Sequence, residues 1–481
     1  VVRAFDRNGK LADERKVSFG FRTFEVKNGK FFLNGNPIRL RHTPVAGDAS
    51  EVYDPGFFEY VKKLGFNAVY LHAGSAGNNQ TLFELLDKHG FLAFCPISDK
   101  LADADTLEEL RRYRNHPANI GYISDPYGQF IFNGLGLTPF QTDDDFMPDS
   151  PKAKEIEKFL KKRQTLFAQG DPERLYIAQG TGNLPGSMRM SHHYPTGGLN
   201  LLDRMMFHAP WTARKNRKLP LSIYEAGCRS IHEMDLQHSD DKFPVSGKKD
   251  LKTWRMVNFE AAARFIGDRA FENWLEAEKL IFRASMRNYR MNGVDSVTPW
   301  GRLWYSMPAP RKGVFKEKDR RRLSWKYFTM PLAESYEDQW MKMNSWYYCL
   351  RALPDRPWPE KYGESYNSIQ PTIFADIYER EMQPLFCTIA GPAGDLFSQD
   401  HNYYGGERVE RSIFAVNDDL AARSFSAELR LSVDGKEYAR ITHQLAAEPG
   451  ETLAVPVGFD LPQTTKRASA KLALFIDGQL G

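Results

Sequence analysis

The chain has 481 residues, of which 42% are hydrophobic and 13% aromatic, enough to build the cores of two or three domains. Its 65 Lys and Arg against 61 Asp and Glu give a formal net charge of +4, without the basic excess typical of nucleic-acid-binding proteins. No run approaches the roughly 18 apolar residues of a transmembrane helix. We therefore expect neither a nucleic-acid nor a membrane partner.

The four cysteines are scattered along the chain and form no CxxC pair, which argues against a zinc site; they are Cys95, Cys228, Cys349 and Cys387. We expect free thiols and no bound metal, and the cysteines leave the cellular compartment undecided. The chain starts at Val1 within an extended stretch that turns at Asn8-Gly9. We expect an N-terminal portion before this point, with a periplasmic or secreted protein as one alternative for its localisation.

The two ends of the chain have the alternating pattern of β-strands. Residues 16–26 are rich in aromatic and β-branched residues, so residues 1–26 are expected to be the end of an immunoglobulin-like β-sandwich. Residues 384–481 are expected to form a C-terminal β-sandwich, with strands at 411–417, 425–433 and 468–476 and a hairpin turn at 433–436.

Between these ends, residues 27–383 alternate between strand-like and helix-like segments, which predicts βαβ units and a parallel sheet. Eight strands with intervening helices predict an α/β fold of the (β/α)8 TIM-barrel type, whose chemistry lies at the C-terminal strand ends. The expected strands are 38–41, 68–71, 92–95, 120–124, 175–178, 188–192, 221–224 and 296–300. The expected helices are 56–64, 81–89, 107–113, 152–169, 271–292 and a closing helix at 371–382.

A single carboxylate ends the apolar run of residues 220–227, which reads PLSIYEAG. This pattern favours a buried strand that brings Glu225 to a pocket and then turns away at Ala226 and Gly227. The alternative is a strand whose last residue caps the next helix.

A second segment, residues 19–41, reads FGFRTFEVKNGKFFLNGNPIRLR. It resembles the junction between the immunoglobulin-like domain and the catalytic barrel in glycoside hydrolase family 2, the β-galactosidase and β-glucuronidase type of clan A. The resemblance spans residues 16–420 and is densest at 16–41, 114–117 and 219–227. It implies an exo-acting, retaining, β-galactosidase-like glycosidase that needs no cofactor, with a carbohydrate substrate and Glu225 as the nucleophile.

The same resemblance suggests neighbours for Glu225. Tyr194, after the sixth expected strand, stands where family members often place a tyrosine that hydrogen-bonds the nucleophile, and His193 precedes it. Trp300, the last residue of the eighth expected strand, resembles the aromatic floor under the sugar, with core packing as the alternative. Other polar residues near expected strand ends are candidates for contacts with substrate hydroxyls or for structural roles: Arg41, His42, His72 and Asp99.

The fourth expected strand departs from the family pattern. Residues 114–117, RNHP, resemble the motif ahead of that strand, which normally ends in Asn-Glu, but Pro126 and Tyr127 occupy that place here. The nearest carboxylate is Asp125, and Asp143, Asp144 and Asp145 follow. A retaining glycosidase needs two carboxylates about 5–5.5 Å apart, and an inverting one about 6.5–9.5 Å. The departure leaves the acid and the stereochemistry open, and its alternative is a glycan-binding barrel protein without an acid/base residue.

Two basic clusters lie near expected strand ends, at 214–218 and 311–322. Facing the pocket, they would favour an anionic glycan. The alternative is a solvated surface of mixed charge, to which Glu317 and Asp319 belong. The oligomeric state is left open.

Overall fold

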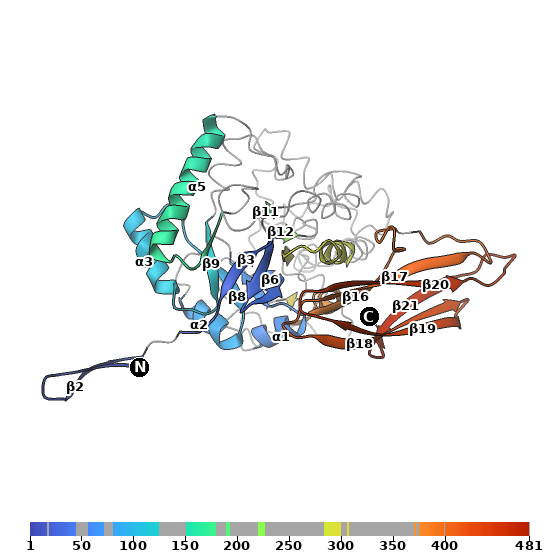
Figure 1. Cartoon of the computed structure of the whole chain (residues 1–481), viewed down its shortest axis with the longest axis horizontal. Coiled ribbons are helices and arrows are strands. Elements are labelled where there is room, and N and C mark those ends of the chain that lie inside the picture. Colours follow the sequence, from blue (N-terminus) through green and yellow to red (C-terminus); the bar gives the residue numbers. More distant parts are fainter. Residues whose placement is uncertain are drawn as a thin grey trace, which may run out of the picture.

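The structure is a computed structural model, and it describes residues 1–16, 19–44, 56–71, 80–124, 151–178, 189–192, 220–226, 283–299, 305–306, 370–371, 375–398 and 400–480. A parallel sheet with its helices forms one body, and an antiparallel C-terminal domain lies beside it (Figure 1).

Eight parallel strands form a single sheet in the order β10-β9-β8-β7-β6-β13-β12-β11. β6, the first of the series in the sequence, pairs with β13, the last, and β10 and β11 form the two edges of the sheet in the described part of the chain. The α/β architecture expected from the sequence is confirmed. The strands are β6 (Leu40–Pro44), β7 (Ala68–Tyr70), β8 (Leu92–Pro96), β9 (Asn119–Ser124), β10 (Leu175–Ala178), β11 (Arg189–His192), β12 (Leu221–Ala226) and β13 (Ser296–Pro299).

Helices alternate with these strands, as the sequence predicted. They are α1 (Phe57–Lys63), α2 (Gln80–His89), α3 (Asp103–Tyr113), α5 (Pro151–Gly170) and α14 (Ala375–Glu381), and residues 283–291 are also helical. Two short strands, β14 (Tyr305–Ser306) and β15 (Gln370–Pro371), pair antiparallel. In the described part of the chain, no helix is long and apolar enough to cross a membrane.

A small antiparallel sheet precedes β6 and packs against the parallel sheet. It comprises β3 (Phe24–Lys27), β4 (Lys30–Leu33) and β5 (Asn36–Ile38), joined by Asn-Gly turns with positive φ at both residues. The rings of Phe24 and Phe31 stack at 5.3 Å, and both pack against Phe94 of β8 in one buried core. Since β5 leads directly into β6, this sheet lies at the N-terminal side of the parallel strands and leaves their C-terminal ends for a site.

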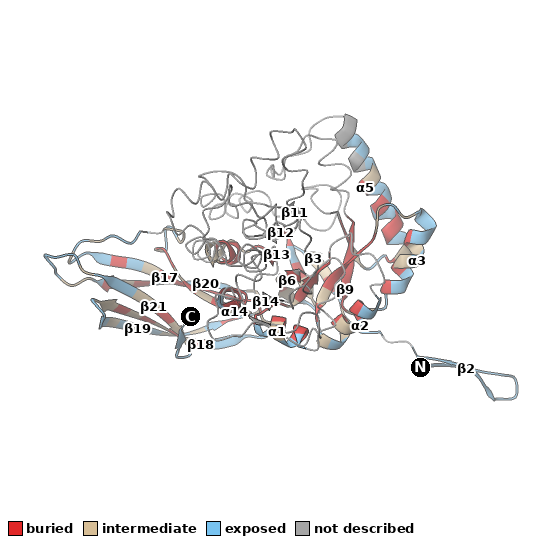
Figure 2. Cartoon of the chain, turned by 180° about the vertical axis from the view of Figure 1, so that it is seen from behind, coloured by how far each residue is buried: buried red, intermediate tan, exposed pale blue. Residues whose placement is uncertain are grey.

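The expected division between residues 26 and 27 falls inside this hairpin. Phe24, on one side of it, belongs to the core of the parallel sheet. The preceding residues form a separate, fully exposed hairpin of β1 (Val2–Phe5) and β2 (Leu11–Arg15), which extends away from the body (Figures 1 and 2).

The C-terminal domain has two antiparallel sheets around one core. One has the order β16 (Leu385–Ala390), β17 (Arg408–Asn417), β20 (Thr452–Asp460), and the other β19 (Lys436–Ala447), β18 (Arg423–Val433), β21 (Ala470–Ile476), β22 (Gln479–Leu480). Ile413 and Val457 of the first sheet pack with Phe425 and Leu429 of the second. The hairpin turn at Asp434-Gly435, with φ of 47° and 79°, lies where the sequence predicted it.

Candidate active site

Glu225 is the penultimate residue of β12, so its backbone lies at the C-terminal edge of the parallel sheet. β12 pairs with β11 on one side, where Tyr224 is opposite His192, and with β13 on the other, where Ala226 is opposite Pro299. The two neighbouring strands therefore end opposite the residues that immediately precede and follow Glu225. In the sequence, His193 directly follows β11 and Trp300 directly follows β13.

The pairing of β12 with β13 is irregular at Glu225. Ile223 is opposite Val297 and Ala226 is opposite Pro299, so Tyr224 and Glu225 together oppose Thr298 alone. One extra residue on one strand is a β-bulge, a feature that is common at barrel rims and next to active sites, where it redirects a side chain. The backbone therefore departs from regular alternation at Glu225, the carboxylate that ends the apolar run of residues 220–227.

The start of β12 is fixed by Asp295, which is 2% exposed. Its carboxylate accepts a 2.9 Å hydrogen bond from the Leu221 amide, and its own amide donates to the Leu221 carbonyl at 2.9 Å. Its carbonyl accepts from the Leu40 amide at 2.8 Å. Since β6, β12 and β13 are joined through one residue, the register that sets the position of Glu225 is well defined.

Asp99 lies three residues beyond the end of β8, on the expected face, but its carboxylate belongs to a buried ion pair. Asp99 Oδ1 is 3.3 Å from Arg163 Nε of α5, and both side chains are 4% exposed. Arg163 also donates to the Thr106 hydroxyl and the Ser98 carbonyl, each at 3.2 Å. The structure thus gives Asp99 the task of tying α5 to the loop after β8, in place of the expected contact with substrate.

Arg41 was expected at the end of the first parallel strand, but it is the second residue of β6. The reason is that residues 36–38 pair with β4, so the first parallel strand starts at Leu40. The Arg41 side chain is buried, donates from Nε to the Gly65 carbonyl at 2.8 Å and lies 3.6 Å from Asp418 of the C-terminal domain. Arg41 therefore supports the domain junction and not a substrate pocket.

A buried hydrogen bond that the sequence did not indicate joins the last residue of β9 to the second residue of β10. The hydroxyl oxygens of Ser124 and Tyr176 are 2.7 Å apart, and burial raises the pKa of Tyr176 well above its usual range. Ser124 is the last residue of β9, directly before Asp125. The position of Ser124 next to Asp125 could have drawn attention to it in the sequence, but nothing near Ser124 indicates that its partner is Tyr176, 52 residues away.

Of the remaining candidates, His42 is the third residue of β6, where it is buried and stacks on Phe94. The other expected site residues lie outside the described residues: Asp125, His72, His193, Tyr194 and Trp300. The side chain of Glu225, the aspartates 143–145 and the two basic clusters also lie outside them. Within the described ranges, no group of three or more His, Cys, Asp or Glu side chains is arranged to hold a metal ion.

Comparison with known proteins places this arrangement among glycosidase folds. No protein-family model matches the chain. A β-galactosidase of Oenococcus oeni (strain ATCC BAA-331 / PSU-1) is 24% identical over 135 residues, which cover 26% of this chain and 12% of that protein. A β-D-mannosidase from Dictyoglomus thermophilum superposes with a TM-score of 0.56 at 14% identity, covering 99% of this chain and 54% of that one. The exo-chitosanase CsxA of Amycolatopsis orientalis gives a TM-score of 0.50 at 15% identity, covering 98% and 52%.

The chain therefore has a glycoside hydrolase fold, and it spans about half the length of these solved structures. At this level of identity the likeness concerns the fold alone, and the chemistry has to come from the site.

Proposed function

We propose that the chain carries the catalytic barrel of a glycoside hydrolase that cleaves a β-glycosidic bond of an oligo- or polysaccharide, acting from the chain end with retention of configuration. Glu225 is the nucleophile in this proposal. The observation that carries it is the position of Glu225 in a β-bulge at the C-terminal edge of β12, where the neighbouring strands β11 and β13 also end, opposite Tyr224 and Ala226. The fold shared with a β-mannosidase and an exo-chitosanase supports it.

In this proposal the eight parallel strands close into a TIM barrel, and Glu225 acts at the C-terminal end of its strands. The carboxylate attacks the anomeric carbon while an acid protonates the leaving glycosidic oxygen, which yields a covalent glycosyl-enzyme. The residue that acted as the acid now acts as a base and takes a proton from water, and the resulting hydroxide releases the sugar from Glu225. No metal or organic cofactor takes part.

Asp125 is the proposed acid/base because it directly follows β9, whose last residue Ser124 is held to β10 through Tyr176. Tyr194 is proposed to hydrogen-bond Glu225, and Trp300 to form the floor under the sugar ring. His193 and His72 are proposed to contact substrate hydroxyls. Arg41 and Asp99 are excluded from this set, because their side chains are committed to buried ion pairs.

A β-galactoside is the first candidate substrate, because the curated relative is a β-galactosidase. A β-mannoside and a β-glucosaminide follow from the enzymes whose fold the chain shares. An anionic glycan, suggested by the basic clusters, remains a further candidate.

A second candidate function is a glycan-binding protein that does not hydrolyse its ligand. The observation in its favour is that β9 ends in Ser124 and is followed by Asp125-Pro126, with no glutamate at the place of the usual acid. Such a protein would bind glycans with Glu225 either present or replaced.

A panel of aryl β-glycosides separates the two functions. We expect the wild type to hydrolyse at least one of the galactoside, mannoside, glucosaminide and glucuronide, and Glu225→Gln to lose roughly a thousandfold or more of that rate. Ser222→Ala is the matched control, since Ser222 lies in the same strand and should retain the rate. Glycan binding without turnover in both the wild type and Glu225→Gln would overturn the enzyme proposal.

A further inference from the structure

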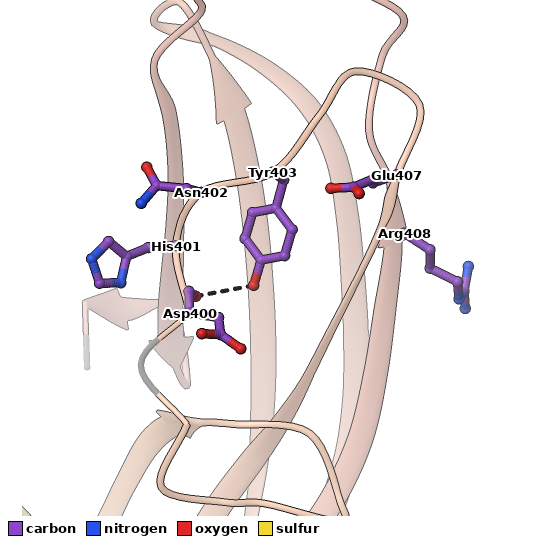
Figure 3. A pocket seen from close by; sticks show the side chains of 6 residues that line it. All are labelled: Asp400, His401, Asn402, Tyr403, Glu407 and Arg408. Atoms are coloured by element: carbon purple, nitrogen blue, oxygen red, sulfur yellow. Dashed lines mark hydrogen bonds between the residues drawn. The ribbon is translucent and has the colours of Figure 1, made fainter.

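The C-terminal domain contains a pocket that neither the sequence analysis nor the proposed catalysis uses. It has a volume of about 460 Å³ and lies in the segment that connects β16 to β17, as Figure 3 shows. The residues that line it are Asp400, His401, Asn402, Tyr403, Glu407 and Arg408. Five of the six side chains carry an amide, imidazole, carboxylate or guanidinium group, and the sixth is a phenol.

The pocket wall is held in place by its own hydrogen bonds. The Tyr403 hydroxyl donates to the Asp400 carbonyl at 3.0 Å, the contact drawn in Figure 3. Arg411 of β17 donates to the same carbonyl and to the Tyr403 hydroxyl, and its guanidinium carbon lies 5.6 Å from the centre of the Tyr403 ring. A pocket with a fixed wall loses little conformational entropy when a ligand binds.

An exposed aromatic residue directly follows the pocket-lining Tyr403 in the chain. Tyr404 is 82% exposed, and its amide donates to the carboxylate of Glu407, another lining residue, at 2.7 Å, which closes a tight turn through Gly405 and Gly406. Gly406 has a φ of 83°, and a Cβ on Gly405 would lie 2.6 Å from the backbone of Thr464. The turn therefore requires both glycines, and its backbone joins the exposed Tyr404 to two residues of the pocket lining.

The charged side chains that line the pocket limit which ligands it can bind. Two carboxylates, Asp400 and Glu407, stand against one guanidinium, Arg408, which already pairs with Asp460 at 3.0 Å, so acidic groups outnumber the guanidinium by one. A phosphate or sulfate would meet this excess of acidic groups. The Asp400 carboxylate accepts from the Ser398 hydroxyl at 3.1 Å, and no metal-binding group occurs among the described residues. The lining fits a neutral ligand with many hydroxyl groups.

We propose that the pocket and Tyr404 together form a binding site for a neutral oligosaccharide, separate from the site at the end of β12. Asn402 and the carboxylates supply donors and acceptors for sugar hydroxyls, and the Tyr404 ring offers an apolar face to the C–H side of a pyranose. A polysaccharide held there would raise the local concentration of its chain ends for the barrel. Binding at this pocket does not depend on hydrolysis by the barrel.

Affinity electrophoresis of the full chain tests the proposal. The gels contain β-1,4-galactan, galactomannan or hydroxyethyl cellulose as neutral probes, and dextran sulfate as an anionic one. The variants are Tyr404→Ala and Asn402→Ala. Tyr438→Ala is the matched control, because Tyr438 is an exposed tyrosine, 48% accessible, on β19 of the same domain.

We expect at least one neutral probe to retard the wild type and Tyr438→Ala, with affinity about tenfold lower in Tyr404→Ala and Asn402→Ala, a loss of about 1.4 kcal/mol. The rate on aryl β-glycosides and the midpoint of thermal unfolding should stay unchanged in all three variants. The Glu225→Gln background separates the two proposals, since retardation through Tyr404 should persist there. Equal retardation of the wild type and Tyr404→Ala, retardation by dextran sulfate alone, or no retardation in any gel would overturn the proposal.

Discussion

Arg290 and Asp418 form a buried ion pair across the junction of the two domains, with Nη2 and Oδ2 2.8 Å apart and the side chains 3% and 0% exposed. Arg290 comes from the helical segment before β13, and Asp418 directly follows β17. Arg39 also pairs with this carboxylate at 2.5 Å, and Arg41 lies 3.6 Å away. Burial by itself raises the pKa of Asp418, but Arg39, Arg290 and Arg41 outweigh it and hold the pKa below its usual value.

Asp418→Asn should therefore destabilise the protein strongly, because it leaves the buried guanidinium groups of Arg41 and Arg290, and the partly buried one of Arg39, without their carboxylate. The expected loss in the free energy of unfolding is about 3–5 kcal/mol, measured by urea denaturation. Asp460→Asn is the control, since Asp460 pairs with Arg408 on the surface with 76% of its side chain exposed, and little change is expected there. Equal stability of the two variants would contradict the role of Asp418.

His42 predicts a pH dependence of stability. Burial lowers its pKa from 6.5 to about 4, and it stacks on Phe94 at 6.3 Å between ring centres. Between these two pH values the unfolded chain binds a proton that the folded chain excludes, so stability is present above pH 6.5 and is lost as the pH falls towards 4. The loss amounts to about 3 kcal/mol. His42→Phe should remove this part of the profile, and parallel curves of unfolding free energy against pH for both proteins would contradict the assignment.

Asp99→Asn separates a structural from a substrate-binding role. Because Asp99 pairs with buried Arg163, the change should lower the midpoint of thermal unfolding while KM for the best aryl glycoside stays within about twofold. Lys162, which pairs with exposed Asp103, offers a control in Lys162→Met, for which neither quantity should move. A large increase in KM for Asp99→Asn at an unchanged unfolding midpoint would return Asp99 to the substrate pocket.

Much of the fold was readable from the sequence because apolar runs and turn residues act locally. The Asn28-Gly29 and Asp434-Gly435 turns form where such pairs predict them, because both residues adopt the positive φ that these turns need. The run 221–224 was readable as a strand because a parallel strand is buried on both faces, and Leu221, Ser222 and Ile223 are all buried. The first parallel strand was predicted at 38–41 but begins at Leu40. Residues 36–38 and 40–44 both have strand-like patterns, and only the pairing of residues 36–38 with β4 separates the two strands.

The roles of Arg41 and Asp99 could not be read in the same way. An arginine near a strand end has the same local pattern whether it meets a sugar or a carboxylate of another domain. Arg39 and Arg41 both pair with Asp418, which is 379 residues from Arg39. Arg163, the partner of Asp99, lies on a later helix. Long-range ion pairs of this kind are decided by how the elements pack, which the order of residues does not display.

Covalent trapping of the nucleophile tests directly whether Glu225 attacks the anomeric carbon of a β-glycoside. The protein is incubated with 2-deoxy-2-fluoro-β-glycosyl fluorides of the galacto, manno and gluco series, digested with pepsin and analysed by mass spectrometry. We expect one sugar per chain, attached to Glu225 in the peptide that contains residues 221–226, and no label in Glu225→Gln. A sugar bound to another carboxylate, or hydrolysis of aryl β-glycosides that survives Glu225→Gln, would contradict it.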